Sequence, residues 1–231
     1  MKIIRFLLRS LVFIFLTVLT QVGGIIYLIS LSTYKLIDNR FEKKFYRWAL
    51  KFASFLVLYV IATFLLVPVI ARPLGRVPLP LTGSDNLQPL NFLTCLLDRH
   101  YVRPELKGTT LEVAKEMNAK YPGTELNYLD ANFPFINGFP LVPHLSHNDG
   151  KKIDLAFCYT DNKAGKATNE VPSIIGYGIC EEPRANEINT AQQCAANGNW
   201  QYSFMKKVIP QSSRSDFTFD SARTKDLVNF F

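Results

Sequence analysis

The sequence predicts an α+β protein in which two N-terminal transmembrane helices are followed by a small α+β domain. The first 72 residues contain two long apolar segments without charged side chains, and the rest of the chain mixes helical and strand-like patterns with many prolines and glycines. The predicted organisation is therefore a two-span hairpin at 1–72, a linker at 73–84 and an α+β domain at 85–231.

The two apolar segments cover about 11–32 and 52–71. Each has about 20 residues, enough at 1.5 Å per residue to cross a hydrocarbon core of about 30 Å. The alternative for the first segment is a cleaved signal peptide, because Lys2, Arg5 and Arg9 precede it. Its apolar run is longer than that of a signal peptide, and no small-residue cleavage site follows, so a membrane hairpin is favoured. The alternative for the second segment is a buried core helix, which its length and all-round apolarity disfavour.

The formal net charge of +7 belongs to the membrane flanks. Residues 1–72 contain ten Lys or Arg and two acidic residues, whereas residues 73–231 contain 16 Lys or Arg and 17 Asp or Glu. Basic side chains beside apolar segments bind anionic lipid headgroups. A nucleic-acid partner, which would need a basic domain surface, is therefore not expected.

The orientation in the membrane rests on charge and on cysteines. Six basic residues lie between the two predicted spans and five flank them on the other side, which slightly favours a cytoplasmic loop and an exported domain. All four cysteines follow the second span, and Cys180 and Cys194 flank a polar stretch that a disulfide could close. We therefore expect a bacterial inner-membrane protein with a periplasmic domain, the alternative being a cytosolic domain with free thiols.

The domain begins with helical patterns and continues with strands. Residues 86–101 have helical spacing, Thr109 or Thr110 can cap a second helix that ends near Lys120, and the Tyr-Pro-Gly sequence at 121–123 stops it. Residues 125–129 and 153–160 read as strands, the second apolar on both faces except at Asp154. Asp220 and Ser221 begin a last helix, which runs to Phe231 without a cap and looks cut short.

The candidate metal ligands are His147 and Asp154. A carboxylate at the start of an apolar strand needs a hydrogen bond, a cation or a metal, and His147 stands seven residues before it. A neutral imidazole and a carboxylate are both zinc ligands, and Gly150 between them permits a tight turn. The alternative is a surface histidine and an aspartate paired with Lys151 or an arginine.

The stretch from His147 to Asp154 resembles the H-x-x-G-x-x-x-D signature of the zinc D-Ala-D-Ala metallopeptidase superfamily, which includes murein endopeptidases, lysostaphin-type enzymes and hedgehog-type domains. The resemblance implies a metallopeptidase-like fold in which residues 155–157 continue the metal-bearing strand. It also implies Zn²⁺ as cofactor and a hydrolase acting on peptidoglycan peptides of the cell wall.

The sequence departs from the family pattern in three places. Lys152 stands where the family has a small residue, and Leu145 stands where it has Ser or Thr. No histidine follows His147 to supply the third zinc ligand or the general base of the family's H-x-H motif. We therefore expect an incomplete site, because the chain lacks the C-terminal part of its domain or because the protein has lost catalysis.

These residues predict a membrane-anchored, zinc metallopeptidase-like protein, the alternative being a non-catalytic anchored domain that binds cell wall or protein. Four further candidates have structural interpretations that we favour over functional ones. His144 is interpreted as a polar turn residue and not as a ligand. His100 is interpreted as a cation at a helix C-terminus, and Cys158 as a core thiol or a disulfide partner. The alternating Trp200, Tyr202 and Phe204 fit a core strand or a cleft wall.

Overall fold

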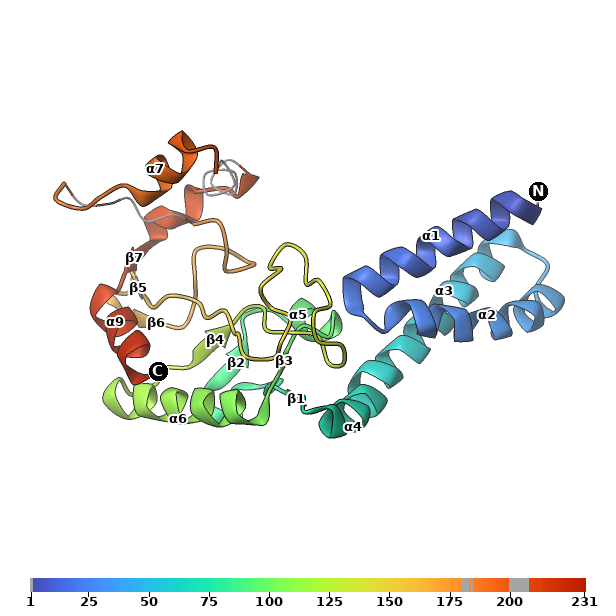
Figure 1. The fold of residues 1–231 in the computed structure, drawn as a ribbon, viewed down its shortest axis with the longest axis horizontal. Coiled ribbons are helices and arrows are strands. Elements are labelled where there is room, and N and C mark those ends of the chain that lie inside the picture. The colour runs from blue at the N-terminus through green and yellow to red at the C-terminus, as the bar shows by residue number, and fades with distance from the viewer. Residues whose placement is uncertain (1, 180–182, 184, 200–207) are drawn as a thin grey trace. The chain divides into compact units, whose positions relative to one another are not determined.

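The structure is a computed structural model that describes residues 2–179, 183, 185–199 and 208–231. It mixes helices with small sheets, which confirms the predicted combination of α and β elements (Figure 1). Two compact units divide the chain, and each is described by itself below. The first consists of Met1–Leu81, Phe92–Gly108 and Asp130–Ile153, and the second of Thr82–Asn91, Thr109–Leu129 and Asp154–Phe231.

Three long helices begin the first unit. They are α1 (Lys2–Thr20), α2 (Gly23–Arg40) and α3 (Lys44–Ile61), and α3 continues through a π-helix at Ala62–Leu66, α4 (Val67–Ala71) and a 3-10 turn at Arg72–Leu74. The predicted span at 11–32 is wrong in its bounds, because the helix stops at Gln21, where φ is +65°. The hydroxyl of Thr20 accepts a hydrogen bond of 2.8 Å from the Gly23 backbone and so stabilises this turn.

Helix α2 packs against both α1 and α3. A Cβ on Gly24 would lie 2.0 Å from Thr17 Oγ1, so this glycine is required for the close approach of α2 to α1. Towards α3, the rings of Tyr27 and Phe55 meet edge to face at 6.5 Å, and the hydroxyls of Thr33 and Ser54 lie 3.0 Å apart. Close contacts at small residues and hydrogen bonds between hydroxyls are the usual means by which membrane helices associate.

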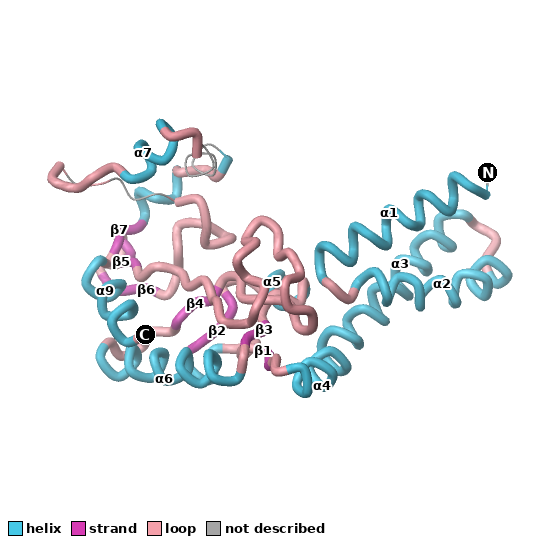
Figure 2. Tube along the Cα trace, viewed as in Figure 1, coloured by secondary structure: helices cyan, strands magenta, loops and turns pink. Residues whose placement is uncertain are grey.

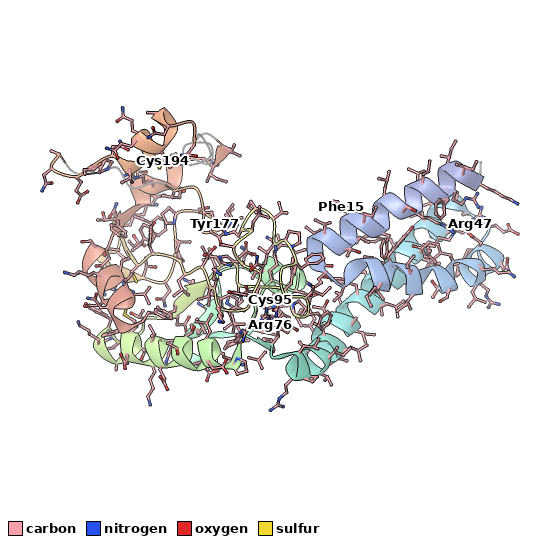
Figure 3. The ribbon with its side chains drawn as sticks, viewed as in Figure 1. Phe15, Arg47, Arg76, Cys95, Tyr177 and Cys194 are labelled. Atoms are coloured by element: carbon pink, nitrogen blue, oxygen red, sulfur yellow. The ribbon has the colours of Figure 1, made fainter. Side chains whose placement is uncertain are left out.

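Two of these helical segments are long and apolar enough to cross a membrane, namely Lys2–Thr20 and Lys44–Leu74. Their most apolar windows are only 6% and 22% buried, unlike those of core helices. Phe15 on α1, labelled in Figure 3, is 63% exposed. The two apolar segments predicted from the sequence are therefore present as helices with exposed apolar surfaces.

The rest of the first unit is short elements and loops. Strand β1 (Val77–Pro78) lies within the stretch predicted as a linker. It pairs in antiparallel fashion with β3 (Tyr101–Val102). The helix predicted over 86–101 is reduced to α5 (Leu93–Leu96). Asn86 and Asp98 have φ of +57° and +56°, values that no α-helix accommodates, and Pro89 lies between them.

The second unit contains two small sheets. Strand β2 (Leu87–Pro89) pairs in parallel with β4 (Leu126–Tyr128), and β5 (Tyr159–Asp161) lies between β6 (Lys166–Thr168) and β7 (Phe217–Phe219). Helices α6 (Pro104–Lys120), α7 (Thr190–Ala196) and α9 (Ser221–Phe230) accompany them, and long loops join the elements (Figure 2).

Most of the predicted elements of this unit are confirmed, with one large exception. The strand at 125–129 appears as β4, the second helix ends at Lys120, and the Asp220 side chain caps α9 by accepting from the Arg223 backbone at 3.0 Å. The second helix, however, begins at Pro104 and not at Thr109 or Thr110, because proline fits the first turn. The strand predicted at 153–160 is wrong, since only a bridge at Leu155 and the start of β5 are paired.

The predicted Cys180–Cys194 disulfide is wrong, because Cys194 on α7 is a free thiol (Figure 3). Cys180 lies outside the described residues, as do Trp200, Tyr202 and Phe204. Cys95 and Cys158 are buried, which is how a thiol behaves as a small apolar side chain. The even number of cysteines therefore no longer supports an oxidising compartment.

A buried carboxyl group holds α3 against the α5 segment. Asp98 is fully buried and accepts hydrogen bonds from Thr63 at 3.3 Å and Tyr59 at 3.4 Å. Burial raises the pKa of Asp98 to about 8, although both hydroxyls act in the opposite direction. His100 is buried too, and desolvation lowers its pKa to about 3, so it is a neutral side chain and not the helix-end cation that we predicted.

We predict that Asp98→Asn stabilises the protein at high pH. In the wild type the unfolded state releases the Asp98 proton near pH 4 and the folded state only near pH 8, so the free energy of unfolding falls between these values. Asparagine removes this loss and tolerates the positive φ. The variant should be more stable by more than about 1 kcal/mol at pH 8, measured by unfolding in detergent. An advantage that is the same at pH 4 and pH 8 would contradict the assignment.

Candidate metal centre

A short backbone ladder supports the loop that carries the candidate ligands. Tyr101 and Asn132 exchange two backbone hydrogen bonds, of 3.0 and 3.1 Å, and the Ala131 N–H donates to the Arg99 carbonyl at 2.7 Å. An ion pair between Arg99 and Asp130, 3.3 Å apart, lies beside this ladder. Segment 130–132 is therefore fixed along its whole length.

The side chain of Asn132 extends this order to residues 150–152. Its Nδ2 donates to the carbonyls of Tyr101 at 3.3 Å and Lys152 at 2.8 Å, and its Oδ1 accepts from the Gly150 N–H at 3.0 Å. Asn132 is 1% exposed, so water does not compete with these bonds. One amide thus uses its donors and its acceptor to hold the turn between the two predicted ligands.

Two arginines hold the same turn from another direction. Arg76 donates to the Asp149 carbonyl at 2.7 Å and to Asn137 Oδ1 at 2.6 Å, while Arg103 donates to the Asp149 carbonyl at 3.0 Å. Desolvation, with the nearby charge of Arg103, lowers the pKa of Arg76. Gly150 has a φ of +79°, and a Cβ there would lie 1.9 Å from Arg76 Nη1. Gly150 is therefore required both by its backbone conformation and by its contact with Arg76.

His147 is buried, and its ring orientation is fixed. Its Nδ1 lies 2.7 Å from the carbonyl of Ala131, and because a carbonyl only accepts, Nδ1 carries the proton. In the neutral ring the lone pair is then on Nε2. A histidine that donates one ring N–H to a backbone carbonyl while it binds metal through the other nitrogen is the common arrangement in metal sites.

The carboxylate of Asp154 is held by a tyrosine. Asp154 Oδ2 accepts a hydrogen bond of 2.6 Å from the Tyr177 hydroxyl (Tyr177 is labelled in Figure 3), and the Asp154 carbonyl accepts from the Leu129 N–H at 2.8 Å. Lys152, by contrast, pairs with Asp149 at 3.3 Å. Backbone and lysine hydrogen bonds keep the pKa of Asp149 low, so the Asp149 carboxylate is ionised.

His144 joins the two predicted ligands. The imidazoles of His144 and His147 meet edge to face at 5.5 Å, and one ligand atom each from His144, His147 and Asp154 lie within 4.8 Å of one another. All three belong to the eleven-residue stretch 144–154, so these distances are local to that stretch. The sequence favours His144 as a polar turn residue. Its position three residues before His147 is the signal that could have identified it as a third candidate ligand.

The donor set fits a zinc ion. Two imidazoles and one carboxylate are the usual ligands of zinc sites that keep a fourth position open. Ligand atoms about 2.1 Å from one tetrahedral ion lie about 3.4 Å apart. The three ligand atoms, which lie within 4.8 Å of one another, would therefore move closer together to share one ion.

Comparison with known proteins adds no relative to this picture. No protein family matches the chain. No curated protein and no solved structure matches it either. The resemblance to zinc D-Ala-D-Ala metallopeptidases rests on the motif residues themselves and stays a prediction.

We predict that Gly150→Ala destabilises the protein and Gly108→Ala does not. At Gly150 an alanine meets both an unfavourable φ and the Arg76 guanidinium, which should cost about 1–3 kcal/mol or more. Gly108 lies within α6 with nothing within 4 Å of its added Cβ, so alanine should be neutral or stabilise by up to about 1 kcal/mol. Thermal unfolding of both variants checks this, and equal effects would contradict the need for glycine at position 150.

Proposed function

We propose that this protein is a membrane-anchored zinc-binding protein whose centre is formed by His144, His147 and Asp154. The observation that carries the proposal is the convergence of these three side chains within 4.8 Å. The hydrogen bonds of His147 to Ala131 and of Asp154 to Tyr177 support it, because each restrains a ligand that would otherwise rotate.

The proposed reaction is the hydrolysis of peptides of the bacterial cell wall, a substrate class that follows from the family resemblance alone. If bound at such a centre, a zinc ion would supply Lewis-acid chemistry and would lower the pKa of a bound water to about 7. In this proposal the chain contributes two imidazoles and a carboxylate on a loop that Asn132, Arg76 and Arg103 hold in place. We assign no residue as general base.

Zinc binding without catalysis is the second candidate. It is favoured by the sequence, in which no histidine follows His147 to supply the base of the family's second motif. In that case the domain would bind cell-wall or protein partners, with the metal in a structural role.

Membrane anchoring is proposed from the helices α1 and α3. Both expose many large apolar side chains, and such a surface is unfavourable in water. We place the protein in the inner membrane of a bacterium, with its remaining domain in the periplasm.

We predict that the purified full chain in detergent retains one zinc ion, measured by metal analysis after dialysis and by calorimetric titration with zinc. His144→Ala, His147→Ala and Asp154→Ala should each lower the affinity by more than the roughly 10- to 100-fold that loss of an outer hydrogen-bond partner costs. Asp85→Ala, which removes an exposed carboxylate, is the matched control and should bind like the wild type. Unchanged affinity in the folded His144→Ala variant would exclude the three-ligand centre.

We predict further that the zinc-loaded chain cleaves peptides released from peptidoglycan, detected by mass spectrometry, and that a chelator stops the reaction. Asp154→Ala should remove the activity, and Asp85→Ala should retain it. Zinc binding with no cleavage of any cell-wall peptide would favour the non-catalytic candidate.

A further inference from the structure

The order and packing of α1, α2 and α3 determine on which side the N-terminus lies. Helix α2 packs against both neighbours, with a tight turn at Gln21 on one end and a short connection at residues 41–43 on the other (Figure 1). Consecutive helices therefore run antiparallel to each other. A two-span hairpin would place the N-terminus on the side of the end of α3, whereas three antiparallel helices place it on the opposite side.

Ion pairs join the end of α2 to the first part of α3. Asp38 near the end of α2 pairs with Lys51 at 2.5 Å and Arg47 at 3.9 Å, both on α3 (Arg47 is labelled in Figure 3). The charge of Arg5, in the second turn of α1, also acts on Asp38. At the opposite end, the Gln21 side chain accepts a hydrogen bond of 2.8 Å from the Phe135 backbone.

The basic residues of the helices gather at the end that holds residues 41–43, which we call the basic end. The basic end has nine basic residues and two acidic ones, Asp38 and Glu42. The opposite end has two basic residues, Arg72 and Arg76. Tyr46 and Trp48 are 51% and 66% exposed at the start of α3, as aromatic side chains are at a membrane interface. The basic residues of this end are Lys2, Arg5, Arg9, Lys35, Arg40, Lys43, Lys44, Arg47 and Lys51.

Resting on the proposed membrane anchoring, we propose that the chain crosses the bilayer three times and that its basic end binds the anionic headgroups of the cytoplasmic leaflet. Helix α2 is the third crossing. It is less apolar than α1 and α3, but its Gly24, Tyr27 and Thr33 are in contact with those helices. The N-terminus and residues 41–43 are then cytoplasmic, and the end of α3 leads out on the other side.

With three crossings, the two sides of the membrane differ clearly in their number of basic residues. With two spans, six basic residues stood against five; with three helices, nine stand against two. The positive-inside rule then assigns the orientation on charge alone, without the disulfide that the structure does not bear out.

The test maps three sites in the full chain, expressed in the inner membrane of a bacterial host. A specific protease site is placed before Lys2, in the 41–43 connection, or in the 162–165 turn between β5 and β6, with one site in each variant. The first two should be cut only in inverted vesicles and the third only in spheroplasts. Cleavage of the site before Lys2 in spheroplasts would overturn the three-crossing topology. Release of the chain by a carbonate wash is a separate result, which would overturn the anchoring itself.

A charge variant tests the headgroup contact. The variant Arg5→Gln, Arg9→Gln, Lys43→Gln, Lys44→Gln should increase severalfold the fraction of chains whose 162–165 site faces the cytoplasm. Lys115→Gln, at an exposed side chain of α6, removes a positive charge far along the chain and should change nothing. An unchanged orientation in the quadruple variant would contradict the role of the basic end.

Discussion

The candidate centre depends on the buried amide of Asn132. Its backbone is paired with Tyr101, and its side chain binds the carbonyls of Tyr101 and Lys152 and the N–H of Gly150. These bonds connect the Tyr101–Asn132 backbone ladder to the turn at residues 150–152, which has no regular secondary structure. Because Ala131 precedes Asn132 and accepts from His147, the same segment sets both the path of the loop and the rotation of its buried imidazole. A loop without secondary structure can hold ligands in place only through such contacts.

The sequence predicts local features well where the cause is local. The cap at Asp220, the stop after Lys120 and the strand β4 each follow from adjacent residues, and each is present. The helix predicted over 86–101 has the right apolar spacing but is not formed over that length. Its Asp98 instead accepts a hydrogen bond from Thr63, 35 residues earlier in the chain, which local spacing cannot reveal. The strand predicted at 153–160 fails for a related reason: alternation shows that both faces are apolar but not whether a neighbouring strand pairs with it.

The candidate site was predictable in its ligand types and not in its number of ligands. His147, Gly150 and Asp154 could be chosen from their spacing, and Gly150 has the positive φ that a tight turn needs. The packing of Arg76 against Gly150 could not be foreseen, because Arg76 lies 74 positions earlier. It also means that the glycine of the motif has a structural reason independent of any metal. The stronger support for a metal is therefore the meeting of two imidazoles and a carboxylate, which the folding of the turn does not itself require.

The N-terminal helices show how one residue can divide a long apolar run. Residues 11–32 contain no charge, and hydropathy treats them as one continuous span. The left-handed conformation of Gln21, with Thr20 bonded to the Gly23 backbone, divides this run and reverses the chain. The close fit of Gly24 against Thr17 then lets α2 return along α1, where its hydroxyl groups contact helices. Hydropathy averages over the very residues that make the turn, so the path of the chain in this segment follows from packing between the helices and not from the apolarity of any one helix.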